Sequence, residues 1–116
     1  MTGPILVVED SAPVRGLVRF ILEDGGFSVL EAADRQQAFV AIQESGATLE
    51  LVICDLQLPG GSGFEVGKRV RDTCPALKIL YMSGHDVRQQ VSGETEFIMK
   101  PFTPEELLAK VRTLIG

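Results

Sequence analysis

Five short apolar segments, separated by longer segments of helical character, constrain the fold of this chain more than any other feature. Their apolar character is nearly continuous, which is typical of strands covered on both faces of a parallel sheet. We therefore expect five parallel strands. The segments run from Ile5 to Val8, Phe27 to Leu30, Leu49 to Cys54, Lys78 to Met82 and Glu96 to Met99.

The segments between them carry helix signals. Pro13 suits the first turn of a helix. Asp34 is a candidate N-cap of a second helix, which extends to Glu44. Ser62 is a candidate N-cap of a third helix, which extends to about Asp72. The first helix has an apolar stripe at helical spacing, formed by Val14, Leu17, Val18, Ile21 and Leu22.

The last helix is the best marked. Thr103 and Glu106 form a capping box, and Pro104 takes the first helical position. Its buried stripe consists of Leu107, Leu108, Val111, Leu114 and Ile115.

Alternating strands and helices joined by right-handed crossovers give a doubly wound α/β fold with helices on both faces of the sheet. The 116 residues match the size of one domain, and no linker is visible, so we expect a single domain over residues 1–116. In such a fold, ligands bind outside the carboxyl ends of the strands.

Composition argues against several classes of protein. The net charge is -5 and no basic block occurs, so direct nucleic-acid binding is not expected. No apolar run approaches the roughly 18 residues that span a bilayer, and no secretion signal is present, so we expect a cytoplasmic protein without a membrane partner. Cys54 and Cys74 lack metal-ligand spacing and are interpreted as structural.

Polar residues gather where the apolar segments end. Glu9 and Asp10 follow the first segment, Asp55 the third, Ser83 the fourth and Lys100 the fifth. Each alone has an ordinary interpretation as a turn residue or a solvated charge. Together, three carboxylates repel and raise one another's pKa unless a cation neutralises them. A hard divalent ion such as Mg²⁺, which keeps positions open for phosphate oxygens, is the natural partner.

The stretches VVEDS, ICDLQLPGGSG, YMSG and FIMKPF, in this order, resemble the response-regulator receiver domain, the phosphoacceptor module of two-component signalling. The resemblance covers essentially the whole chain. YMSGH with KPFTPEELLAKVR is most similar to the receivers of hybrid sensor histidine kinases. The resemblance implies a flavodoxin-like, five-stranded sheet of order 2-1-3-4-5.

The resemblance also implies a metal site and a phosphorylation site. Asp55 corresponds to the phosphoacceptor. Asp10 corresponds to a direct ligand of Mg²⁺, Glu9 to an acidic neighbour acting through water, and Gln57 to a further ligand through its backbone carbonyl. Mn²⁺ could replace Mg²⁺.

The remaining implied roles concern catalysis and switching. Lys100 matches the family's ammonium group and precedes a cis peptide bond to Pro101, Ser83 matches the switch hydroxyl, and Phe97 the switch aromatic. The donor would be a sensor histidine kinase or a histidine phosphotransfer domain. The protein would be a signalling phosphoacceptor that catalyses only its own phosphorylation and dephosphorylation.

Two other functions share this fold class. A flavodoxin-type electron carrier would cradle the FMN phosphate in a hydroxyl-rich loop after the first strand, but EDSAP offers one serine. A phosphohydrolase using an aspartyl phosphate would show a DxD pattern there, whereas Glu9 and Asp10 are adjacent.

The first helix is expected, by resemblance, to dock on the histidine donor. Pro13 and Phe102 are expected to belong to an apolar collar around the site. Val14 and Leu17 are expected to pack in the core, and Phe20, well away from the stripe, to be exposed.

The sequence departs from the family between Ser83 and Lys100, which are only 17 positions apart, fewer than the resemblance implies. We expect the fourth helix to be short, from Val87 to Ser92, because so few residues remain. Many receivers dimerise through the face that this helix helps to form. We therefore expect the isolated domain to be a monomer.

Overall fold

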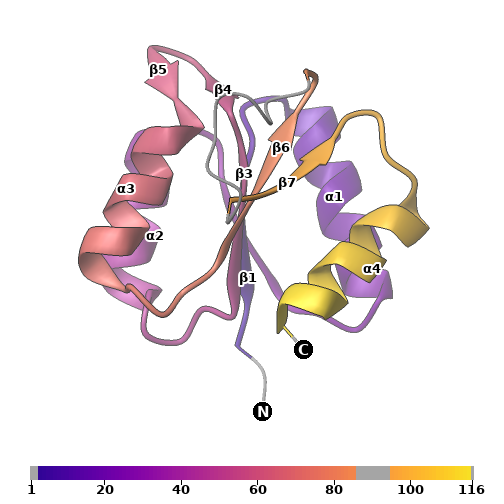
Figure 1. Ribbon diagram of the computed structural model, residues 1–116, viewed down its shortest axis with the longest axis horizontal. Helices are drawn as coiled ribbons and strands as arrows, with labels where there is room; N and C mark the ends of the chain where they lie inside the picture. The colour runs from indigo at the N-terminus through magenta and orange to yellow at the C-terminus, as the bar shows by residue number, and fades with distance from the viewer. Residues whose placement is uncertain (1–2, 86–94, 116) are drawn as a thin grey trace.

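Five parallel strands form one sheet. The computed structural model describes residues 3–85 and 95–115. The strand order is β2-β1-β3-β6-β7, with all neighbouring pairs parallel, so the doubly wound fold and its order are confirmed (Figure 1). The strands are β1 (Ile5–Val8), β2 (Val29–Ala32), β3 (Leu51–Asp55), β6 (Ile79–Ser83) and β7 (Glu96–Met99).

Helices cover both faces of the sheet. In Figure 1, α1 and α4 lie on one side of the sheet and α2 and α3 on the other. No helix in residues 3–85 and 95–115 has the length and apolar character needed to cross a membrane. The short helix expected between Val87 and Ser92 lies outside the described residues. The helices within the described part of the chain are α1 (Ala12–Asp24), α2 (Arg35–Ser45), α3 (Gly63–Thr73) and α4 (Pro104–Ile115).

The hydrophobic core has two layers because helices pack on both faces of the sheet. All four residues of β1 are fully buried. Leu6 and Val8 pack in the cluster that contains residues of α2 and α3, and Ile5 and Val7 in the cluster that contains residues of α1 and α4. Side chains of a strand alternate between the faces, so burial on both faces requires a continuous apolar run.

The predicted helix starts are confirmed. Asp34 accepts a hydrogen bond from the backbone N–H of Gln37 at 2.8 Å and caps α2. Ser62 caps α3 in a reciprocal capping box. Before α4, the Thr103 hydroxyl accepts from the Glu106 backbone N–H at 3.1 Å, and a Glu106 carboxylate oxygen accepts from the Thr103 N–H at 3.0 Å.

Three predicted strand starts are wrong. Lys78 was expected to begin a strand, but β6 begins one residue later, at Ile79. The other two errors are larger. Phe27 and Leu49 were expected in strands but precede them, because their backbone N–H groups close the preceding helices. The Phe27 N–H donates to the carbonyl of Leu22 at 3.0 Å, and the Leu49 N–H donates to that of Ser45 at 3.2 Å. Their apolar character reflects burial of the side chain and not pairing of the strand.

The prediction for Leu17 is also wrong. Leu17 is 57% exposed, whereas Val18, Ile21 and Leu22 are buried. The buried stripe of α1 is narrower than expected, and Leu17 lies beyond its edge. Phe20 is 66% exposed, as predicted. An apolar patch is therefore left on the outer surface of α1.

A small hairpin, not predicted, follows Asp55. It consists of β4 (Gln57–Leu58) and β5 (Gly61–Ser62), which pair in antiparallel fashion. Pro59 and Gly60 make the turn, and Gly60 has a φ of 77°. A proline followed by a glycine with positive φ is the signature of a type II turn, so the signal was present in the sequence.

Candidate functional site

The parallel sheet brings the predicted polar residues to one edge. Glu9 and Asp10 directly follow β1, Asp55 ends β3, Ser83 ends β6 and Lys100 directly follows β7. These strands are neighbours in the sheet, with β1 beside β3, β3 beside β6 and β6 beside β7. Residues far apart in the sequence therefore meet at the carboxyl ends of the strands.

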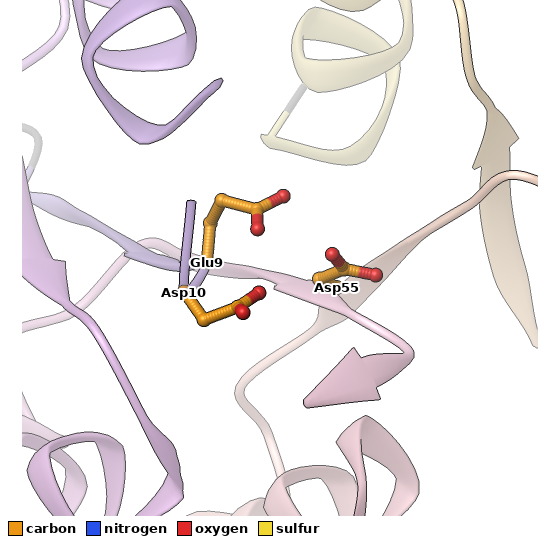
Figure 2. A group of neighbouring side chains, drawn as sticks. All are labelled: Glu9, Asp10 and Asp55. Carbon is orange, nitrogen blue, oxygen red and sulfur yellow. The ribbon is translucent and has the colours of Figure 1, made fainter. Parts of the chain in front are cut away.

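Three carboxylates form a compact cluster. Figure 2 shows the side chains of Glu9 and Asp10, from the end of β1, and of Asp55, from β3, gathered in one space. One oxygen atom from each lies within 4.8 Å of the others. Glu9 is 1% exposed and Asp55 6% exposed, whereas Asp10 is exposed. Two of the three charges are thus largely removed from water.

Lys100 partly neutralises the buried pair. Its Nζ lies 2.8 Å from Glu9 Oε1 and 2.9 Å from Asp55 Oδ2. Burial by itself lowers the pKa of the Lys100 ammonium, but the hydrogen bonds to Glu9 and Asp55 outweigh this effect, and the pKa is raised overall. The group is therefore held in its charged form. The peptide bond from Lys100 to Pro101 is cis, as the resemblance implied.

Glu9 is tied into the backbone around it. Burial raises the pKa of its carboxyl, and Asp55 raises it further, while the hydrogen bonds from Lys100 and from the Ser11 N–H oppose the shift. The Ser11 N–H lies 3.0 Å from Glu9 Oε2. Arg15 of α1 donates to the Glu9 backbone carbonyl at 2.8 Å. Nothing in the sequence pattern predicted this contact of Arg15.

Asp55 is oriented by both of its oxygen atoms. Oδ1 accepts a hydrogen bond from the Gln57 backbone N–H at 3.0 Å, and Oδ2 accepts from Lys100. The chain then turns back sharply, since the Gly63 N–H donates to the Leu56 carbonyl at 2.9 Å. A Cβ atom at Gly63 would lie 2.2 Å from the Asp55 backbone oxygen, so this close approach requires glycine.

Ser83 and Phe97 lie on the neighbouring strands. The Ser83 hydroxyl donates to the His85 backbone carbonyl at 2.8 Å and accepts from the His85 N–H at 3.1 Å. The Lys100 backbone N–H donates to the Ser83 carbonyl at 2.7 Å, which ties the ends of β6 and β7 together. Phe97 is half-buried against the core cluster of α2 and α3.

The donor set fits a hard divalent cation. Three carboxylates lie together, and the Lys100 ammonium group bonds to two of them, Glu9 and Asp55. The exposed Asp10 leaves the cluster accessible from solvent. Carboxylate and carbonyl oxygens are the ligands of Mg²⁺ and Mn²⁺. A bound cation would relieve the remaining repulsion between the carboxylates.

Comparison with known families decides the class of this site. Residues 5–112 match the model of the response regulator receiver domain. The chain belongs to this family. Receiver domains are the phosphoacceptor modules of two-component signalling, so neither an electron carrier nor a phosphohydrolase is retained.

Individual relatives of the receiver domain agree with the assignment. PhoB, the phosphate regulon transcriptional regulatory protein of Escherichia coli (strain K12), is 36% identical over 122 residues, which cover 99% of this chain and 52% of PhoB. The receiver domain thus spans about half the length of the curated relatives it matches.

Solved structures show the same fold. The receiver domain of the hybrid histidine kinase CckA is 30% identical, with a TM-score of 0.86 over 98% of this chain and 100% of that one. The chemotaxis response regulator CheY4 of Vibrio cholerae is 29% identical, with a TM-score of 0.88 over 98% of this chain and 99% of that one. The expected likeness to a hybrid kinase receiver is therefore found.

Proposed function

We propose that Asp55 is the phosphoacceptor of this receiver domain and that its phosphoryl donor is a phosphohistidine. The observation that carries the proposal is the position of its carboxylate, which lies within 4.8 Å of the Glu9 and Asp10 carboxylates and 2.9 Å from Lys100. We propose that residues 1–116 form one such domain, which acts on no substrate other than its own phosphoryl group.

The transfer itself needs little covalent chemistry from the protein. A carboxylate oxygen of Asp55 forms a bond to phosphorus while the bond from phosphorus to the donor imidazole nitrogen breaks, and the electron pair stays on that nitrogen. Lys100 supplies positive charge beside the attacking carboxylate. The Gln57 N–H fixes the other carboxylate oxygen, so the nucleophile is oriented before the donor arrives.

Glu9, Asp10, Asp55 and the backbone carbonyl of Gln57 would hold Mg²⁺, or Mn²⁺, either directly or through water. The ion would neutralise phosphoryl oxygens as charge develops on them. The donor set supports this assignment, because it consists of oxygen atoms with an excess of negative charge.

Signalling would follow from a change of partner at Ser83. Its hydroxyl now bonds to the backbone of His85, and a phosphoryl oxygen on Asp55 would offer a charged and therefore stronger acceptor. Movement of Ser83 and its loop would let the half-buried Phe97 turn inward. The surface beside β7 would then change for a partner protein.

We propose a sensor histidine kinase or a histidine phosphotransfer domain as the donor. It would dock beside α1, where Leu17 and Phe20 are exposed. Such kinases draw on ATP, so a cytoplasmic location is proposed. The net charge of -5 supports a domain that does not itself bind nucleic acid.

Incubation with acetyl phosphate and Mg²⁺, followed by intact mass measurement, tests the assignment. The wild type should gain one phosphoryl group and Asp55→Asn none, because an amide is a poor nucleophile. Asp72→Asn is the matched control, since Asp72 is exposed and pairs only with Lys68 among the described ion pairs. Labelling of Asp55→Asn at the wild-type level would refute the proposal.

A further inference from the structure

Arg35 lies outside the carboxylate cluster, yet its guanidinium group contacts the hairpin that carries Gln57. Arg35 begins α2, and its Nη1 forms an ion pair with Glu65 Oε2 of α3 at 2.6 Å. The other oxygen of Glu65 accepts a hydrogen bond from the Ser62 backbone N–H at 3.0 Å. Ser62 is the last residue of β5. Glu65 therefore joins Arg35 to one strand of the hairpin.

The guanidinium group also lies directly against the hairpin turn. A Cβ atom at Gly61 would lie 2.4 Å from Arg35 Nη1, and one at Gly60 would lie 3.0 Å from Nη2. The two consecutive glycines thus leave the space that the guanidinium group occupies. Arg35 is held by the turn on one side and by Glu65 on another.

The hairpin needs support of this kind. Each strand has only two residues, and a two-stranded hairpin alone is marginally stable in water. Gln57, Pro59 and Gly60 are exposed, so burial contributes little at these positions. Gln57 pairs with Ser62 across the hairpin and donates its N–H to Asp55. Leu58, the other residue of β4, is buried in the core cluster of α2 and α3 and anchors this strand. The position of β5 is the second determinant of where the exposed Gln57 lies.

We propose that Arg35 is a positioning residue for the metal site. Acting through Glu65 and the turn, it fixes β5 and hence the Gln57 backbone, whose carbonyl is the Mg²⁺ ligand in the proposed function on which this inference rests. Mg²⁺ demands near-ideal octahedral geometry, so a carbonyl already in place avoids an ordering cost on binding. Groups that orient ligands typically change metal affinity by about 10- to 100-fold.

The sign of the effect separates positioning from charge. Removal of a cation near a metal site should strengthen Mg²⁺ binding through Coulomb forces alone. Loss of positioning should weaken it. Arg69 offers a matched control, because it also joins α3 to α2, with its guanidinium carbon 4.2 Å from the centre of the Phe39 ring. It lies four residues beyond Glu65 along α3.

Two measurements on the same variants test the proposal. Mg²⁺ affinity is measured by calorimetric titration, and amide hydrogen exchange at Gln57 and Ser62 is measured without metal. Arg35→Met and Glu65→Gln should each weaken Mg²⁺ binding by about tenfold, and the double variant no more than either. Amide hydrogen exchange at Gln57 should be faster than in the wild type in both Arg35→Met and Glu65→Gln. Arg35→Lys should recover part of the affinity, and Arg69→Met should change neither quantity.

Several outcomes would overturn the proposal. The positioning role is contradicted if Arg35→Met shows unchanged hydrogen exchange at Gln57 or binds Mg²⁺ with wild-type affinity. In that case, loss of Mg²⁺ binding in Asp10→Asn would show that the metal site itself stands. If the wild type binds no Mg²⁺, or Asp10→Asn binds it equally well, the proposed metal site fails as well. Glu65→Gln keeps the capping box, so its hydrogen exchange at Gln57 serves if Arg35→Met does not fold. Its Mg²⁺ affinity does not separate the two effects, because loss of an anion also weakens cation binding through Coulomb forces.

Discussion

Lys100 neutralises more buried negative charge than any other residue described at this site. It bonds to two carboxylates that are almost fully buried, and burial is the main cause of the raised pKa of Glu9. Without the ammonium group, both carboxylates would be desolvated with less compensation. A buried charge that loses its partner is strongly destabilising.

Replacement of Lys100 by methionine should therefore cost about 2 kcal/mol of unfolding free energy at pH 8 without Mg²⁺. The Lys100 contribution is fully present below the ordinary pKa of 10.5 and is lost only as pH rises through its raised folded-state pKa. In the variant, the penalty should shrink toward pH 5, because the raised folded-state pKa of Glu9 lets the folded protein take up a proton first. Urea unfolding at both pH values measures this.

Lys68→Met is the control for that experiment. Lys68 pairs with Asp72 on the exposed surface of α3, where an ion pair contributes little. Its removal should hardly change stability at either pH. A penalty for Lys100→Met that grows toward pH 5 would contradict the role assigned to Glu9.

At the scale of elements, α3 packs unusually close to β6 at one glycine. A Cβ atom at Gly67 would lie 1.8 Å from the Tyr81 hydroxyl and 3.0 Å from its Cζ. Tyr81 is 2% exposed, and its ring meets that of Phe64 edge-on at 5.0 Å between centroids. Burial also raises the pKa of Tyr81 to about 12, so the hydroxyl stays neutral. The glycine sets the distance between helix and sheet.

Gly67→Ala should destabilise the domain by about 2 kcal/mol, because overpacking outweighs the gain in helix propensity. Tyr81→Phe in the same chain should recover part of the loss, since it removes the atom closest to the new methyl group. Gly16→Ala is the control, because no atom lies within 4 Å of a Cβ there. It should stabilise α1 by about 0.5–1 kcal/mol. Thermal unfolding of these three variants and the wild type checks the signs.

The outer surface of α1 gives a second prediction for an element. Leu17→Glu and Phe20→Glu should leave acetyl phosphate labelling intact, because neither residue belongs to the carboxylate cluster. Transfer from the histidine kinase should fall by about tenfold if these side chains are central to docking. Val40→Glu on α2 is the control, since Val40 is 47% exposed on a different helix. Equal transfer in all three variants would remove α1 from the docking surface.

For the whole molecule, we predict a monomer in both phosphorylation states. The reason is the short connection between Ser83 and Lys100, which leaves few residues for a helix beside β7. Light scattering at tens of micromolar, with and without beryllofluoride and Mg²⁺, measures the mass. A shift to a dimer in the presence of beryllofluoride would contradict the prediction. It would show that the short connection between Ser83 and Lys100 does not prevent association.

The sequence alone determined those features that depend on neighbouring residues. Apolar runs located the five strands of the sheet, and side chains such as Asp34 and Ser62 marked helix starts because a cap bonds to the turn that follows it. The positions of Asp55 and Lys100 at the ends of two apolar runs predicted that they lie at the same edge of the sheet, because the carboxyl ends of parallel strands share one edge.

Tertiary structure decided what depends on residues distant in the chain. Lys100 and Glu9 are 91 positions apart, and Arg35 and Glu65 are 30 apart, so their distances follow from strand register and helix packing. Leu17 matched the helical stripe, yet its exposure depends on how far the neighbouring elements extend over α1. Local pattern specifies which face of an element is apolar, but only the packed fold specifies how much of that face is covered and which charges meet.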